Sequence, residues 1–242
     1  MENTIHFVLQ AKGGIGKSFV STLLAQHLLN ETGAVRCFDT DQENTTFTHY
    51  EALQVKHVGV TNASRLIDPK KFDGLMEILL TEEGNFVIDT GANTFSNFLA
   101  YMVENEVFPM LEDAGKTTYV HTIVGGGDTL ADTANGFHAI AHKVNGTHVV
   151  LWFNEHFGEI RTAEGKPFTE TQAYRQSAAK LSGVVRLYRR NPATYGEDIR
   201  KLNTRRHTIA QALASGEYTL MEKQRIKTFS RDVFGQLKGL AW

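Results

Sequence analysis

Short apolar runs alternate with segments of helical periodicity along the whole chain. The apolar runs have the length of buried strands and are rich in β-branched and aromatic residues. They are Ile5–Gln10, Val35–Phe38, Phe86–Ile88, Tyr119–Val124, Val149–Phe153 and Val184–Tyr188. Between them, apolar residues recur at helical spacing, as they do from Phe19 to Leu29. This alternation predicts an α/β fold in which helices cover both faces of a mostly parallel sheet.

We expect one domain over residues 1–242, because no linker or low-complexity tract interrupts the chain. Its 242 residues and 41% hydrophobic content suit a single α/β domain. From Ala193 onward the periodicity predicts three helices and no strand, so residues 193–242 form a helical C-terminal region. The chain has one cysteine, Cys37, and neither a signal peptide nor a long apolar run, which favours a cytoplasmic protein.

A glycine-rich segment lies between the first predicted strand and the first predicted helix. This strand–loop–helix context is typical of a Walker A loop, in which backbone N–H groups and the helix N-terminus bind nucleotide phosphates. We expect Lys17 to bridge the β- and γ-phosphates and Ser18 to give its hydroxyl to Mg²⁺. The predicted nucleotide-binding residues of this segment are Gly13, Gly14, Ile15, Gly16, Lys17, Ser18 and Phe19.

Acidic residues end two of the predicted strands, at the edge of a parallel sheet where ligands bind. Asp39 and Asp41 follow the second strand, and Asp89 follows the third. We expect Asp89 to bind Mg²⁺ directly or through water, as a Walker B aspartate does. Gly91 has no side chain to keep its N–H from the γ-phosphate. A helix-capping turn is the alternative for the first pair, and an exposed strand-end carboxylate is the alternative for Asp89.

The segment Lys12–Ser18 resembles the deviant Walker A loop of the ParA/MinD family of P-loop ATPases, although Ala11 replaces the first glycine of the general pattern. In that family a signature lysine, here Lys12, reaches the phosphates of the partner in an ATP-dependent dimer. The resemblance therefore implies a homodimer with Lys12 and Lys17 as catalytic residues.

The segment Asp39–Asn44 is similar to the family's switch I, without its proline, and Asp89-Thr90-Gly91 is similar to its switch II. This resemblance implies that Asp41 is catalytic and orients the attacking water, with Asp39 as its support. It also implies a metal site of Ser18, Asp41 and Asp89. Within the family, these two segments resemble the conjugation-associated TraL/StbC-like branch found on mobile plasmids.

The nucleotide base has weaker candidates. Asn154 ends the fifth predicted strand, where family members often recognise adenine with an asparagine, and no guanine-recognition motif follows it. Arg190 lies at the position of the family's adenine-side loop, or alternatively on a surface that faces DNA. The resemblance therefore implies ATP and Mg²⁺ as the cofactors.

The C-terminal quarter is basic: residues 183–242 hold 12 Lys/Arg against 5 Asp/Glu, a balance of +7 in a chain of net charge −2. Seven of these cations lie close together in the sequence and predict a surface that binds DNA without sequence preference. They are Arg186, Arg189, Arg190, Arg200, Lys201, Arg205 and Arg206. A solvated helical face is the alternative. The amphipathic stretch from Ile226 to Leu240 predicts a helix packed on the sheet, with membrane binding less favoured.

These features together predict a dimerising ATPase of the ParA/MinD type. The resemblance implies that it hydrolyses ATP to ADP and phosphate, and acts with an unidentified protein partner in plasmid partition, conjugative transfer or cargo positioning. Two alternatives stay open: a nucleotide-bound adaptor without turnover, and a membrane-associated positioning ATPase of the MinD kind.

Overall fold

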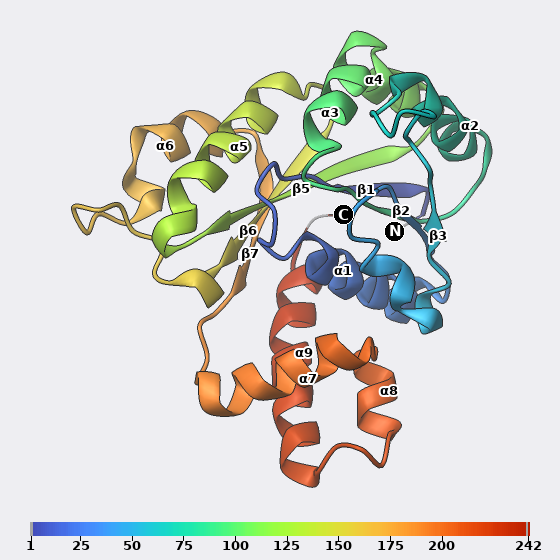
Figure 1. Ribbon diagram of the computed structural model, residues 1–242. Coiled ribbons are helices and arrows are strands. Elements are labelled where there is room, and N and C mark those ends of the chain that lie inside the picture. Colours follow the sequence, from blue (N-terminus) through green and yellow to red (C-terminus); the bar gives the residue numbers. More distant parts are fainter. Residues whose placement is uncertain (1, 241) are drawn as a thin grey trace.

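The computed structural model describes residues 2–240 and 242. Within these residues, seven parallel strands form a single sheet in the order β3-β2-β4-β1-β5-β6-β7 (Figure 1). The strands are β1 Thr4–Val8, β2 Arg36–Asp39, β3 Lys56–His57, β4 Phe86–Asp89, β5 Thr117–Gly125, β6 His148–Asn154 and β7 Leu181–Leu187. All six predicted strands are confirmed, and no end is shifted by more than three residues. The edge strand β3 escaped prediction because its two residues are exposed and polar.

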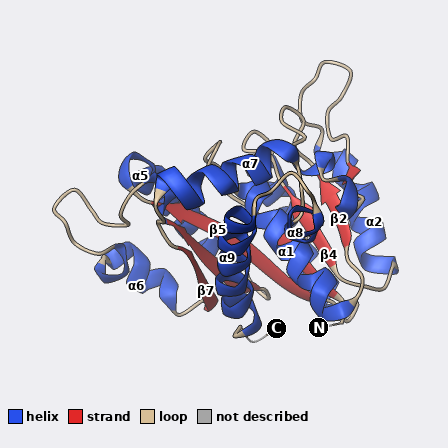
Figure 2. Cartoon of the chain, turned by 90° about the horizontal axis from the view of Figure 1, so that it is seen from below, coloured by secondary structure: helices blue, strands red, loops and turns tan. Residues whose placement is uncertain are grey.

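Helices cover both faces of the sheet, as the sequence pattern predicts (Figures 1 and 2). They are α1 Lys17–Thr32, α2 Asp73–Thr81, α3 Phe95–Glu104, α4 Val107–Asp113, α5 Leu130–Lys143, α6 Gln172–Ala178, α7 Glu197–Arg205, α8 Ile209–Ala214 and α9 Leu220–Lys238. One apolar cluster joins the sheet to α2 through α6, and a second joins it to α1, α7, α8 and α9. The sheet is therefore buried on both sides, which explains why most of its strands are continuous apolar runs.

The long helix α9 packs its apolar side on the second face. Ile226 and Leu237 are fully buried there, and Val233 is 1% exposed. The side chain of Thr219 caps the N-terminus in a capping box with Glu222. The predicted packing of this helix on the sheet is thus confirmed. Among the described residues, no helix is long and apolar enough to cross a membrane.

The sheet brings two predicted acidic residues together. In the parallel register, Asp39 at the end of β2 lies opposite Asp89 at the end of β4, and Asp89 lies opposite Val8 at the end of β1. The loop that follows β1 leaves the sheet at this same edge. Glycine-loop residues and carboxylates that are far apart in sequence therefore converge where β1, β2 and β4 end.

Candidate nucleotide-binding site

The glycine-rich loop after β1 has a backbone that requires glycine at two positions. Gly14 has φ of 70° and Gly16 has φ of 102°, and Gly16 is the N-cap residue of α1. Side chains disfavour this left-handed region, so glycine turns the backbone at low cost. The turn places the loop directly against the N-terminus of α1, where unpaired N–H groups attract anions.

Buried side chains fix the loop from below. Ile15 is 1% exposed, and the carbonyl oxygen of Ile15 accepts a hydrogen bond of 3.0 Å from Nδ2 of Asn154. The Gln10 amide nitrogen donates to the carbonyl of Ile123 at 2.7 Å, and the Gln10 amide oxygen accepts from Ala11 N at 2.8 Å. The loop is therefore anchored to the ends of β5 and β6.

Lys17 and Ser18 open α1 beside the loop. The Lys17 side chain is largely buried, and its amine donates to the carbonyl oxygen of Lys12 at 3.1 Å. Burial lowers the pKa of the Lys17 amine, and the carboxylates of Asp89 and Asp41 partly offset this effect. The amine thus folds over its own loop and faces two acids, which is the environment expected of a phosphate-binding lysine.

Asp89 is the most perturbed acid of the site. One carboxylate oxygen, Oδ1, accepts a hydrogen bond of 2.8 Å from the Ser21 hydroxyl. The other, Oδ2, is buried and has no hydrogen-bond partner in the described part of the chain. Burial raises the pKa of Asp89 to about 7, although the nearby hydroxyl groups of Ser18 and Ser21 oppose the rise.

A divalent cation fits this arrangement. A buried carboxylate oxygen without a partner is costly, and a hard cation that takes oxygen ligands removes the cost. Ser18, Asp89 and Asp41 provide a hydroxyl and two carboxylates on three segments that converge at the loop. Ser21, one turn further along α1, orients the Asp89 carboxylate and escaped prediction because serine inside a helix carries no motif of its own.

Asp39 and Asp41 hold the switch-like turn after β2. Asp39 is fully buried and accepts hydrogen bonds from the backbone of Asp41 at 2.9 Å and of Thr48 at 3.3 Å. Oδ1 of Asp41 accepts from the backbone N–H groups of Glu43 and Asn44 at 2.9 and 3.0 Å. Both carboxylates thus accept hydrogen bonds from backbone N–H groups of this turn, and the cap residue of the short helix that follows is Thr46, so the helix-capping alternative is not what the structure shows. Asp41 also lines the cleft together with the glycine loop. Its hydrogen bonds within the turn are compatible with the predicted role of orienting a water molecule.

Gly91 brings the segment after β4 close to that turn. A Cβ atom at Gly91 would lie 2.9 Å from Cγ of Asp41 and 2.7 Å from the hydroxyl of Thr94. A side chain at this position would force the side chains of Thr94 and Asp41 to shift, so glycine lets the two segments meet without rearrangement. The predicted proximity of Gly91 to the phosphate site rests on this close approach.

A cleft of about 460 Å³ lies between the loop, the turn after β2 and the end of α7. Its lining joins predicted residues to several that sequence reasoning missed. The lining residues are Gly13, Gly14, Gly16, Lys17, Ser18, Phe19, Asp41, Glu43, Asn44, Thr46, Tyr50, Ala92, Asn93, Asn203 and Arg206. Tyr50 and Asn203 gave no signal in the sequence, since they are 153 residues apart and meet through a hydrogen bond of 3.2 Å.

Comparison with known proteins places this chain in a family. Two proteins named TraL from Escherichia coli are 35% and 36% identical to the chain over 238 residues, and each match covers 98% of both sequences. The chain belongs to the TraL family. No family model matches it.

The fold of this TraL-family chain is that of MinD. The MinD cell division protein of Aquifex aeolicus has a TM-score of 0.51 at 12% identity, covering 99% of this chain and 100% of MinD. A MinC:MinD cell division protein complex from the same organism gives 0.50 at 11% identity, covering 96% of both chains. The seven-stranded parallel sheet of the structure agrees with this likeness. So does the resemblance of the glycine-rich loop to the deviant Walker A loop, which the sequence indicated.

Six predicted site residues of the TraL-family chain do not line the cleft: Lys12, Ile15, Asp89, Gly91, Asn154 and Arg190. Asn154 is buried under the loop, where its side-chain oxygen also accepts from the N–H of His156 at 3.1 Å, so its amide supports the loop. Lys12 pairs with Asp132 on α5 at 2.7 Å. Arg190 pairs with Asp232 on α9 at 2.5 Å. The base-contacting roles of Asn154 and Arg190 stay predictions.

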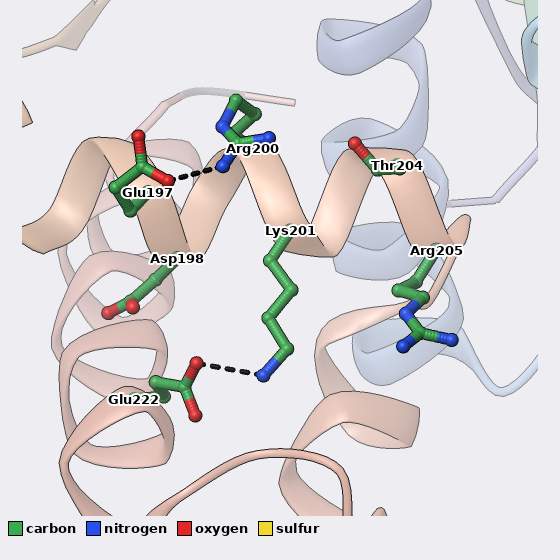
Figure 3. A pocket seen from close by; sticks show the side chains of 7 residues that line it. All are labelled: Glu197, Asp198, Arg200, Lys201, Thr204, Arg205 and Glu222. Atoms are coloured by element: carbon green, nitrogen blue, oxygen red, sulfur yellow. Dashed lines mark hydrogen bonds and ion pairs between the residues drawn. The ribbon is translucent and has the colours of Figure 1, made fainter.

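The basic C-terminal cluster is largely neutralised inside this TraL-family chain. Five of its seven predicted cations form ion pairs with acidic side chains. The pairs are Arg186–Glu155, Arg190–Asp232, Arg200–Glu197, Lys201–Glu222 and Arg205–Glu217. Figure 3 shows two of them along α7. Four of these five acids lie within residues 183–242 and are already counted in the balance of +7. Only Glu155, which lies outside that region, lowers the positive charge of this surface further.

Proposed function

We propose that this chain binds ATP with Mg²⁺, dimerises around it and hydrolyses it to ADP and phosphate. The proposal depends on one observation: Oδ2 of Asp89 is buried and has no hydrogen-bond partner in the described part of the chain. This oxygen lies near Ser18 and the glycine loop. Such an oxygen is costly unless it meets a cation. The MinD fold and the TraL relatives support the same conclusion.

The residues of the site divide the work of hydrolysis. The loop N–H groups and the N-terminus of α1 bind the phosphates, and Lys17 lies between the β- and γ-phosphates. Ser18 and Asp89 would hold Mg²⁺, which would neutralise phosphate charge when bound. Asp41 orients the attacking water. Lys12 leaves Asp132 and reaches the phosphates of the partner, where its charge offsets that of the transition state.

The cellular process we propose is plasmid partition or conjugative transfer, with the chain acting as an ATP-dependent switch in the cytoplasm. Its TraL relatives and its ParA-like loop support this assignment. An unidentified protein partner would read the nucleotide state. We keep nonspecific DNA binding through the basic cluster in the proposal, although few cations of this cluster are free of ion pairs. If the affinity for DNA in the presence of ATP did not change with salt concentration, DNA binding would be removed from the proposal.

The test begins with calorimetry of the wild-type protein with ATP and Mg²⁺. Lys17→Ala should weaken ATP binding by about 1.5–3 kcal/mol because it removes a charge-assisted contact to phosphate. Lys70→Ala, which removes an exposed lysine that does not line the cleft, is the matched control. Equal ATP affinity in the two variants would contradict the assignment.

Turnover separates a hydrolase from an adaptor. Phosphate release by the wild-type protein should depend on Mg²⁺, and Asp41→Ala should bind ATP while releasing little phosphate. Light scattering with ATP and with ADP measures the dimer. Tight ATP binding without phosphate release under any of these conditions would favour the adaptor.

A further inference from the structure

The last residue of α7 and the residue after it line different pockets. Arg205 lines a pocket along α7 with Glu197 and Lys201 (Figure 3), and its guanidinium pairs with Glu217 at 3.1 Å. Arg206 lines the nucleotide cleft instead, together with Lys17 and Asp41. The two neighbouring arginines therefore differ in their surroundings and not in their chemistry.

The backbone and its neighbours hold Arg206 in this direction. Arg206 has φ of 55°, a left-handed conformation that is uncommon for arginine and ends α7. Its guanidinium donates to the carbonyl oxygen of Asn203 at 2.7 Å and lies 6.0 Å from the centre of the Tyr50 ring. Tyr50 is 2% exposed and donates its hydroxyl to Oδ1 of Asn203. A buried ring and an amide thus position the cation at the cleft.

Helix α1 fixes the same region from the other side. The N–H of Ile209, which follows the turn at Arg206, donates to the side-chain oxygen of Gln26 on α1 at 2.6 Å. Helix α1 also carries Lys17 and Ser18 at its N-terminus. Helix α1 therefore contacts the segment that follows Arg206 and also carries the first residues of the phosphate site. A ligand can contact both groups at once when a rigid element of this kind holds them in place.

Arg206 also has charge and hydrogen-bonding capacity to spare. A guanidinium has five N–H donors in a planar fork that matches phosphate oxygens. The hydrogen bond to Asn203 uses one of these donors, and no ion pair to Arg206 is found among residues 2–240 and 242. The loop, Ser18 and Asp41 line the same cleft, so the phosphate end of a nucleotide is what this cation would meet.

We propose that Arg206 is a phosphate-binding residue of the nucleotide site, supplied by the C-terminal helices and positioned by Tyr50 and Asn203. This inference rests on the proposed ATP binding. It assigns a second task to a residue that the sequence placed in the DNA-binding cluster. It also links the nucleotide to α9, because α7 is joined to α9 by the ion pairs of Lys201 with Glu222 and of Arg225 with Asp198.

The experiment compares Arg206→Ala with Arg205→Ala, its neighbour outside the cleft. Affinities for ATP, ADP and AMP are measured by calorimetry with Mg²⁺. Arg206→Ala should weaken ATP binding about ten- to a hundredfold, with a smaller loss for AMP, because a charge-assisted contact to phosphate is removed. Arg205→Ala should stay within about twofold of the wild type. Arg206→Lys should recover part of the loss, since it keeps the charge but not the fork.

Each outcome decides the proposal. If Arg206→Ala loses its native circular dichroism, Arg206→Gln replaces it and keeps a donor for Asn203. A folded variant that binds ATP like the wild type overturns the role of Arg206, and so does an equal loss for ATP and AMP. If the wild-type protein itself binds no ATP while remaining folded, the proposed function fails and this inference fails with it.

Discussion

Replacing Asp89 by asparagine should make the nucleotide-free protein more stable at alkaline pH. Burial raises the pKa of this carboxyl to about 7, against 3.8 in the unfolded chain. Above pH 7 the folded protein must therefore keep a charge that the unfolded chain solvates freely. A difference of about 3 pKa units corresponds to about 4 kcal/mol of lost stability. The neutral asparagine side chain would avoid that cost, while its amide lacks an acceptor at the position of Oδ2, so a net gain of about 2 kcal/mol is expected at pH 8.

The sign of the pH dependence provides the control. As pH falls below 7, the folded state of the wild type takes up a proton at Asp89 and the unfolded state does not, until pH approaches 3.8. Wild-type stability from this group therefore rises between pH 8 and pH 5.5 by about 2 kcal/mol. The advantage of Asp89→Asn should shrink by that amount. Because the other titrating groups are common to both proteins, the difference between their unfolding free energies isolates this carboxyl.

Urea unfolding at both pH values, with and without ATP and Mg²⁺, is the measurement. The ligands should stabilise the wild type and leave Asp89→Asn nearly unchanged, because the variant lacks the carboxylate that binds the cation. A variant that is less stable than the wild type at pH 8 would refute the buried-charge argument. A variant that gains the wild-type increment from ATP and Mg²⁺ would refute the metal site.

Two further predictions concern ion pairing and buried histidines. The pair between Lys12 and Asp132 is exposed and worth at most about 1 kcal/mol, so Asp132→Asn should free Lys12 and strengthen ATP-dependent dimerisation up to about fivefold. Sedimentation should show this change, and no dimer should form with Lys12→Ala. Burial lowers the pKa of His6 to about 3 and lowers that of His121, so folding keeps both neutral. Between pH 7.5 and 5.5 the wild type should lose about 3 kcal/mol more stability than a His6→Leu, His121→Leu double variant, and equal losses would show that these rings titrate normally.

Local sequence predicted the parts of the site that local geometry builds. The glycine loop, Lys17 and Ser18 form one continuous segment, so their arrangement follows from a short pattern and the helix after it. Asp39 and Asp89 could be placed because each ends an apolar strand, and parallel strands end at the same edge of a sheet. These predictions needed no knowledge of how the rest of the chain packs.

Contacts between distant segments could not be predicted in this way. Asn154 has the type and position of a base-binding residue, yet its amide holds the carbonyl of Ile15, a bond that spans 139 residues. The cations of the C-terminal cluster could be counted in the sequence, but Glu155 and Asp232, which pair with Arg186 and Arg190, are identified only when the chain is folded. Composition gives the number of charged residues, and only the fold shows which of them form ion pairs with one another.

The two cations that border the phosphate loop lie on opposite faces of the sheet. Lys12 is held by α5, which belongs to the first apolar layer, and Arg206 extends from α7, which belongs to the second. A nucleotide that engages both would couple the two faces of the sheet. ADP lacks the γ-phosphate and offers less charge to either cation. The difference between ATP and ADP would therefore act on both faces at once, as a switch that a protein partner reads requires.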